Sequence, residues 1–255
     1  MRVVKIGGRA QADARLPAML ADYWSVAPGE ICIVHGGGDE VSAMQRALGR
    51  EAAFVGGRRV TSQGDLELLR MVLSGVVNKR LVNSFVAAGV PAVGLSGEDA
   101  ALIGAELIDA ASLGFAGRPV SINEGLLRAL MKAGYLPVIS PVGYDAATST
   151  GGTLNVNGDD AAAAISAALG ADELFFIVDV EGVKDGHGEL VSSLSIETAR
   201  GLIANGVASN GMAAKLESAE TALVSGVSRV RICELAGLND EERGTFITQS
   251  QSVAL

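Results

Sequence analysis

The chain has 255 residues, of which 49% are hydrophobic, and its 29 acidic and 20 basic residues leave a formal net charge of −9. The apolar fraction excludes a disordered protein, no apolar run reaches the roughly 18 residues of a membrane span, and the acidic balance argues against a nucleic-acid partner. Two cysteines cannot build a disulfide framework or a four-ligand zinc site, and the first residues carry no signal peptide, so we expect a cytoplasmic protein with a large core.

Short apolar runs rich in valine and isoleucine alternate with stretches of helical periodicity along the chain. The predicted strands are 3–6, 31–34, 90–95, 136–140 and 174–180, and the predicted helices are 13–24, 39–48, 64–88, 159–169 and a last one that ends near 225. We expect 100–122 and 143–155 to form hairpins that project from the sheet. This alternation predicts an α/β fold, a three-layer α/β/α sandwich around a central, mainly parallel sheet.

Three predicted strands end in glycine, at Gly7-Gly8, at Gly36-Gly37-Gly38 and at Gly97. In open α/β sheets ligands bind at the carboxyl ends of the strands, and glycines there let backbone N–H groups approach an anion. Any one of these turns is equally well explained as punctuation, but three together favour a ligand crevice. The glycine codes of P-loop proteins, of dinucleotide-binding proteins and of serine hydrolases are absent. His35, inside such a turn, is expected to form local hydrogen bonds rather than act as a general base.

Three charged positions stand in apolar or helical settings. Lys5 interrupts a predicted central strand, where a lysine needs an anionic partner unless the strand lies at an edge. Asp159 and Asp160 open a predicted helix, where acidic residues are ordinary caps. Lys215 is predicted in the first turn of the last helix, against the helix dipole. A bound phosphate would explain this lysine, and so would simple solvation.

Eight short motifs make the sequence recognisable. They are Lys5-Ile6-Gly7-Gly8, His35-Gly36-Gly37-Gly38, Arg59-Val60-Thr61, Leu73-Ser74-Gly75-Val76-Val77-Asn78-Lys79, Gly94-Leu95-Ser96-Gly97-Glu98-Asp99, Asn155-Val156-Asn157-Gly158-Asp159, Asp179-Val180-Glu181-Gly182-Val183 and Gly211-Met212-Ala213-Ala214-Lys215. With these motifs the chain resembles the amino acid kinase family nearly end to end. The Arg-Val-Thr, Val-Asn-Lys and Asn-Val-Asn elements are the narrower ones, and they point to the branch that phosphorylates N-acetylglutamate.

The resemblance implies an amino acid kinase or carbamate kinase-like fold in one domain, 1–255. An N-lobe of about 1–169 would hold the amino acid and the dimer contact, and a C-lobe of about 170–255 would hold ATP. The implied reaction is transfer of phosphate from ATP, with Mg²⁺, to the γ-carboxylate of N-acetyl-L-glutamate, giving N-acetyl-L-glutamyl 5-phosphate in arginine biosynthesis. A homodimer is the implied assembly, through residues 64–88, although a plain core helix explains their apolar residues equally well.

The resemblance also implies roles for individual residues. Lys5 and Lys215 would be the catalytic cations that flank the phosphoryl group, and Asp159 would orient both. The implied amino-acid-binding residues are Gly36, Gly37, Arg59 and Asn155. The implied ATP-binding residues are Lys5, Gly7, Gly8, Asp179, Gly182, Gly211 and Lys215, and no residue is assigned to a metal.

The implied chemistry suits these residues. A γ-carboxylate with a pKa near 4.3 is already ionised at neutral pH, so no general base is needed. Phosphoryl transfer then depends on positioning and on neutralising charge, which lysines and glycine-turn amides can supply. We expect Arg59 to grip the second carboxylate, because an arginine fork binds it bidentately. Arg58 is the neighbouring alternative, and Val60-Thr61 fixes the register in favour of Arg59.

Several alternatives stay open at this stage. A related kinase that acts on aminoadipate or glutamate bound to a carrier protein would need a local basic rim, for which Arg9, Arg58 and Arg59 are candidates. Another acylated glutamate is a further possible substrate, and a non-catalytic sensor of amino acids or nucleotides is an alternative of a different class. Gly158 and Asn210 depart from the usual residues of the family. The absence of an extra N-terminal helix implies an enzyme insensitive to arginine.

Overall fold

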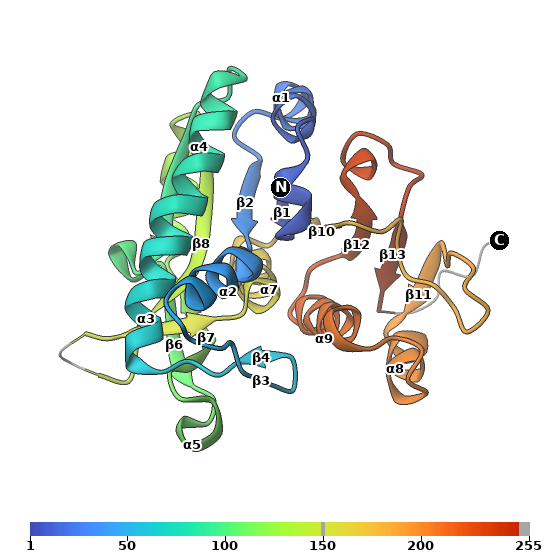
Figure 1. Cartoon of the computed structure of the whole chain (residues 1–255). Coiled ribbons are helices and arrows are strands. Elements are labelled where there is room, and N and C mark those ends of the chain that lie inside the picture. Colours follow the sequence, from blue (N-terminus) through green and yellow to red (C-terminus); the bar gives the residue numbers. More distant parts are fainter. Residues whose placement is uncertain (149–150, 250–255) are drawn as a thin grey trace.

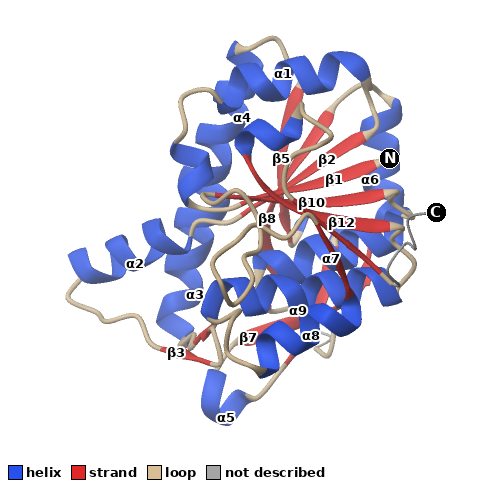
Figure 2. Cartoon of the chain, turned by 90° about the vertical axis from the view of Figure 1, so that its right-hand side faces the viewer, coloured by secondary structure: helices blue, strands red, loops and turns tan. Residues whose placement is uncertain are grey.

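One mixed sheet organises the molecule, and the computed structural model describes residues 1–148 and 151–249 of it (Figures 1 and 2). In the described residues the sheet has eleven strands in the order β11-β13-β12-β10-β1-β2-β8-β6-β7-β9, with β5 also paired to β8. Their bounds are β1 Arg2–Ile6, β2 Ile31–His35, β5 Ala92–Gly97, β6 Ile103–Leu107, β7 Ala116–Ile122, β8 Leu136–Asp145, β9 Thr153–Val156, β10 Glu173–Val178, β11 Ser193–Ser195, β12 Arg229–Glu234 and β13 Thr245–Thr248. A separate hairpin joins β3 Phe54–Val55 to β4 Arg58–Arg59.

The sheet is mainly parallel, as the sequence predicts. Among the described strands of this large sheet, antiparallel pairing occurs only at β12–β13, β6–β7 and β8–β9. All five predicted strands form, with small shifts: β5 begins after Pro91, and β10 ends at Val178 rather than at residue 180. The expected hairpin at 100–122 is β6–β7, and that at 143–155 is β8–β9, whose residues 149–150 lie outside the described part.

Helices cover both faces of the sheet, which gives the predicted three layers (Figure 2). One face packs on α1 Leu16–Val26, α2 Gly38–Ala47, α3 Gln63–Leu69, η2 Arg70–Val77 and α4 Asn78–Ala87, and the other on α6 Glu124–Lys132, α7 Gly158–Leu169, α8 Ile196–Ala204 and α9 Asn210–Val224. The remaining short helices are η1 Arg9–Ala12, η3 Asp99–Ala101, α5 Ala110–Leu113 and η4 Leu235–Leu238. No helix of the described residues is both long and apolar enough to cross a bilayer.

Strand β1 shows how the sequence sets the two faces. Side chains alternate along a strand, so Val3 packs on the α7 and α9 face while Val4 and Ile6 pack on the α1 and α4 face. Lys5 has the same parity as Val3 and therefore points toward α7. Because β10 and β2 flank β1, Lys5 lies in a central strand, and the edge-strand alternative is wrong.

The predicted helix at 64–88 forms as three consecutive segments. A regular α3 passes into η2, which has π-helical hydrogen bonding, and then into α4. Among the six large apolar residues between positions 66 and 73, only Met71 is exposed. The buried ones are Leu66, Leu68, Leu69, Val72 and Leu73. Most of the apolar excess is therefore used inside this chain.

Strands β11, β12 and β13, at the far edge of the sheet, and helices α6 and α8 were not predicted from the sequence. Two arginines in β12 make its sequence look like that of a surface segment. Arg231 is fully buried, its Nε donates to Glu173 Oε1 at 3.0 Å, and its guanidinium lies 4.4 Å from the ring centroid of Phe175. The pairing lets a charged residue occupy a central strand position.

Candidate functional site

A buried cluster of three charges lies where β1, α7 and α9 meet. Lys5 Nζ is 2.7 Å from Asp159 Oδ1, and Lys215 Nζ is 3.2 Å from Asp159 Oδ2. Burial alone would raise the pKa of Asp159, but the charges of Lys5 and Lys215 outweigh it and hold that pKa below its usual range. Asp159 is therefore ionised and the cluster carries a net charge of +1, so it can attract an anion.

The local sequence of α7 places Asp159. Asn157 caps the helix, and its Oδ1 accepts hydrogen bonds from the N–H groups of Asp159 at 2.7 Å and Asp160 at 3.4 Å. Both aspartates lie in the first turn, as predicted, where the helix dipole favours a negative charge. The cap therefore fixes the direction in which each carboxylate leaves the helix.

Lys215 lies one turn further along α9 than the sequence predicts. The helix spans Asn210–Val224, so Lys215 belongs to its second turn, and the first residue, Asn210, has a left-handed φ of +49°. Asparagine tolerates this left-handed conformation better than most residues do. Lys215 Nζ also donates to the carbonyl of Gly211 at 3.3 Å. The lysine therefore folds back toward the start of its own helix.

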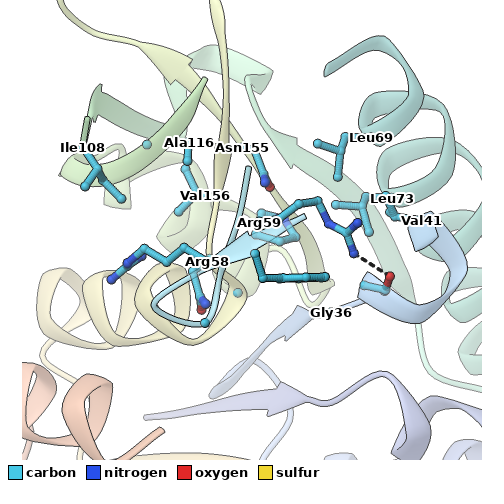
Figure 3. A pocket seen from close by; sticks show the side chains of 18 residues that line it. Gly36, Val41, Arg58, Arg59, Leu69, Leu73, Ile108, Ala116, Asn155 and Val156 are labelled. Carbon is cyan, nitrogen blue, oxygen red and sulfur yellow. Dashed lines mark hydrogen bonds between the residues drawn. The ribbon is translucent and has the colours of Figure 1, made fainter. Parts of the chain in front are cut away.

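A cavity of about 160 Å³ opens beside the charged cluster (Figure 3). Gly36, Gly37, Arg59 and Asn155, the four residues expected to bind an amino acid, all line it. A methyl group built on Gly36 would lie 3.8 Å from Lys5 Nζ, and Gly36 itself lines the cavity. The cavity and the cluster are therefore adjacent. Its apolar wall is formed by Val41, Phe54, Leu69, Leu73, Ile108, Ala116 and Val156.

Arg59 is held in the cavity by neutral groups. Its Nη1 donates to Gln45 Oε1 at 2.6 Å, and its Nη2 donates to the Gly38 carbonyl and to Ser42 Oγ, each at 2.8 Å. Its guanidinium lies 4.8 Å from the ring centroid of Phe54, and burial lowers the pKa of Arg59. Within the described residues no carboxylate forms an ion pair with it. A buried cation with no anionic partner is suited to a carboxylate ligand.

His35 supports the glycine turn rather than the chemistry. It is fully buried, and burial lowers the pKa of its imidazole to about 4. Nδ1 lies 2.7 Å from the Gly36 carbonyl and Nε2 lies 3.1 Å from Asn78 Nδ2. These partners require a neutral ring with its proton on Nδ1. The prediction of local hydrogen bonding is confirmed.

The glycines at the strand ends differ in what they offer. The N–H of Gly7 donates to the Ile177 carbonyl at 2.9 Å, and that of Gly36 donates to the Ile6 carbonyl at 3.0 Å. These two amides hold the strand ends, whereas in the described residues those of Gly8 and Gly37 have no acceptor. Gly37 adopts a φ of +153°, and a methyl group there would lie 2.6 Å from Leu73 Cδ2. Only glycine fits this turn.

The residues expected around a nucleotide are more dispersed. Asp179 follows β10, and its Oδ2 accepts a hydrogen bond from Arg9 Nη1 at 2.7 Å. This hydrogen bond is the main cause that lowers the pKa of Asp179. Gly182 packs against β13, where a methyl group would lie 2.6 Å from Thr245 Oγ1. Gly211 lies in the first turn of α9. No group of three or more histidine, cysteine, aspartate or glutamate side chains in the described ranges is placed to hold a metal ion.

One part of the site escaped the sequence analysis. Asp160 Oδ2 accepts a hydrogen bond from Arg58 Nη1 at 2.5 Å, and Asp160 Oδ1 accepts one from Ser218 Oγ at 2.9 Å. Figure 3 shows Arg58 and Arg59 leaving the same strand in opposite directions. The adjacent Asp159-Asp160 was the available signal, but acidic residues at a helix start are too common to single out a site.

Comparisons with known proteins agree with this geometry. A model of the amino acid kinase family matches residues 1–234. A protein of Cereibacter sphaeroides named acetylglutamate kinase is 41% identical over 263 aligned positions, which cover 98% of this chain and 88% of that protein. The crystal structure of smu.665 from Streptococcus mutans UA159 superposes with a TM-score of 0.87 at 27% identity, covering 98% of both chains. Carbamate kinase from Giardia has a TM-score of 0.72 at 15% identity with the same coverage, which shows a common fold.

Proposed function

The chain belongs to the amino acid kinase family, and we propose that it uses ATP to phosphorylate the γ-carboxylate of N-acetyl-L-glutamate in arginine biosynthesis. The observation that carries this proposal is the Lys5–Asp159–Lys215 cluster beside a cavity that contains the buried, unpaired Arg59. The relatives named acetylglutamate kinase support the choice of substrate. The predicted fold class and the family resemblance are confirmed.

The cavity orients the amino acid by its two ends. Arg59 holds the α-carboxylate, Asn155 contacts the acetylated amino group, and the apolar wall surrounds the acetyl methyl. The γ-carboxylate then points toward the glycine turn and Lys5. Asn155 is itself fixed, because its Nδ2 donates to Thr61 Oγ1 at 2.9 Å. Fixing both ends turns the attack into an effectively unimolecular step.

The two lysines act on the phosphoryl group. An oxygen of the γ-carboxylate forms a bond to the γ-phosphorus of ATP, the bond from that phosphorus to the β,γ-bridging oxygen breaks, and ADP leaves with the electron pair. No proton is transferred, because the carboxylate is already ionised at neutral pH. Lys5 and Lys215 neutralise charge on the phosphoryl oxygens, and Asp159 holds both lysines in place through its ion pairs.

The nucleotide enters from the side of α9. The free N–H group of Gly8 and the start of α9 at Gly211 bind the phosphates. The segment that contains Asp179 and Gly182 contacts the rest of the nucleotide. Residues 1–169 form the amino-acid lobe and 170–255 the nucleotide lobe. Mg²⁺ would arrive with ATP, since this ion usually keeps water and phosphate oxygens as ligands. When bound, it neutralises phosphate charge.

The proposal also includes a cytoplasmic homodimer. Cys32 and Cys233 are buried free thiols, which suits a reducing compartment. The outer face of η2 exposes Met71 and Val76, which supports a contact there between two copies. Light scattering coupled to size exclusion measures the mass, and a Met71→Glu variant should shift a dimer to monomer.

The carrier-protein alternative is less well supported. It needs a free basic rim, but Arg9 pairs with Asp179, Arg58 pairs with Asp160, and Arg59 is buried. The sensor alternative does not explain why two lysines are held around one carboxylate. Both alternatives make predictions that differ from those of a small-molecule kinase.

An ATP-dependent hydroxamate assay, which traps acyl phosphates, tests the function. N-acetyl-L-glutamate, N-succinyl-L-glutamate, free glutamate and free aspartate are compared in parallel. We expect a strong signal with N-acetyl-L-glutamate. Silence with all four substrates, in a protein that binds ATP, would overturn the proposal and favour a carrier-bound substrate.

A further inference from the structure

Asp160 repeats, one residue later on α7, the arrangement of Asp159. Asp159 joins β1, through Lys5, to α9, through Lys215. Asp160 joins β4, through Arg58, to the same helix α9, through Ser218. Because Lys215 and Ser218 are three residues apart, they lie on the same face of α9. The start of α7 therefore grips α9 at two successive points.

The contacts of Asp160 are well satisfied and partly shielded from solvent. Both carboxylate oxygens are used, each by a different element, and the side chains of Arg58 and Asp160 are only 33% and 21% exposed. Ser218 is buried. Charge-assisted hydrogen bonds in such partly shielded positions are stronger than those of exposed pairs. Asp160 touches none of the reacting groups, so its effect must pass through its partners.

Those partners stand on the two sides of the reaction. Arg58 neighbours Arg59 on β4 and lines the amino-acid cavity. Ser218 is about one turn from Lys215 on α9, and its Oγ donates to Asp160 Oδ1 at 2.9 Å. In Figure 1 the hairpin that carries β4 is drawn below α7, and α9 is drawn to the right of α7.

We propose that Asp160 is a positioning residue that couples occupation of the amino-acid cavity to the affinity for the nucleotide, through Arg58 on β4 and Ser218 on α9. This proposal rests on the function proposed above. When the amino acid orders the β3–β4 hairpin, the Arg58–Asp160–Ser218 chain holds α9 in the position that presents Lys215 to the phosphates. Linkage makes the effect reciprocal, so bound nucleotide strengthens amino-acid binding by the same factor.

The test uses two variants that cut the chain at different points. Asp160→Asn preserves volume but turns an amide N–H₂ group or a weaker acceptor toward Arg58, and Ser218→Ala removes only the contact with α9. Arg58 itself is not substituted, because it lines the cavity. Glu124→Gln is the matched control, since it removes the exposed Glu124–Arg128 pair within α6. Thermal unfolding checks that each variant is folded.

Calorimetry measures the Kd of a non-hydrolysable ATP analogue with and without saturating N-acetyl-L-glutamate. We expect the amino acid to lower that Kd by about 5-fold or more in the wild type and in the control. In both variants the ratio should fall below about 2-fold, and the double variant should lose no more than either single one. A purely structural role would change the separate affinities and leave the ratio intact.

The outcomes separate this inference from the function. A wild type that makes acyl phosphate but shows no synergy, or variants that keep the full ratio, would overturn the role of Asp160 alone. Failure of the wild type to bind N-acetyl-L-glutamate would overturn the proposed function and with it this inference. Loss of the ratio in both variants, with the control unchanged, supports the coupling.

Discussion

Replacing Arg59 with lysine tests the central assignment of the cavity. The guanidinium is fixed by Gln45, Gly38 and Ser42, and within the described residues no carboxylate pairs with it. Lysine keeps the positive charge, but its compact ammonium cannot hold these three acceptors and a substrate carboxylate at the same time. The substitution therefore removes the fork while preserving the charge.

The expected loss follows from the hydrogen bonds involved. A hydrogen bond to a charged group contributes about 1.5–3 kcal/mol, and the lysine loses about one such bond to the substrate. Because about 1.4 kcal/mol corresponds to a tenfold change, KM for N-acetyl-L-glutamate should rise about 10- to 150-fold. KM for ATP should stay within about twofold, since Arg59 lies on the amino-acid side.

The assay measures hydroxamate formation with N-acetyl-L-glutamate and with its α-amide, N-acetyl-L-isoglutamine. If Arg59 binds the α-carboxylate, the α-amide already lacks the interaction, and the Arg59→Lys substitution should cost it little. Arg80→Lys is the control, because Arg80 forms a half-exposed pair with Glu40 at 2.8 Å. A KM within threefold of the wild type, or an equal penalty on both substrates, would refute the assignment.

Three further predictions concern the charged cluster. Lys215→Ala should lower kcat by at least about 100-fold and leave nucleotide binding within tenfold by calorimetry; retained turnover would contradict its role. The folded-state pKa of Asp159 lies below 3.8, so its ionised form stabilises the fold above about pH 4, and this stabilisation is lost as the pH falls through the folded pKa. The difference in unfolding free energy between the wild type and Asp159→Asn, measured by denaturation, should therefore shrink in acid. A difference that does not change with pH would contradict this. Gly158→Ala should raise the unfolding free energy by about 0.4–1 kcal/mol, because alanine lowers the conformational entropy of the unfolded chain. The new methyl group fits, since it would lie 3.4 Å from Lys5 Cε. A destabilised variant would show that the turn needs glycine.

Features that depend on short stretches of chain were predictable from the sequence. A lysine in an apolar strand and glycines at strand ends are local patterns, and the structure places Lys5, Gly36 and Gly37 at the carboxyl ends of two neighbouring strands, β1 and β2. The pairing of Asp160 with Arg58 was not predictable, because it joins residues 102 positions apart that each have a common local explanation. Tertiary contacts of this kind leave no periodic signal.

The two misplaced features have physical causes. The sequence analysis places Lys215 in the first turn of the last helix, but α9 already begins at Asn210, whose φ is +49°. Charges at Arg229 and Arg231 suggest a surface segment, but Glu173 on the neighbouring strand neutralises both, at 3.0 Å from each. In both cases the local sequence alone does not show the element, and a backbone conformation or a contact with a neighbouring strand explains it.

The π-helical segment η2 determines how far α3 is rotated about the helix axis relative to α4. Upstream, Leu69 borders the amino-acid cavity, and Leu73 of η2 does the same; downstream, Asn78 hydrogen-bonds to His35 under the glycine turn. Each residue of an α-helix advances the side-chain direction by about 100°, and a π-turn accommodates one residue more per turn. Deleting a single residue from η2 would rotate α3 by about that angle relative to α4. Leu69 would then no longer point into the cavity while Asn78 supports the glycine turn. The number of residues in η2 therefore determines whether both contacts can form at once.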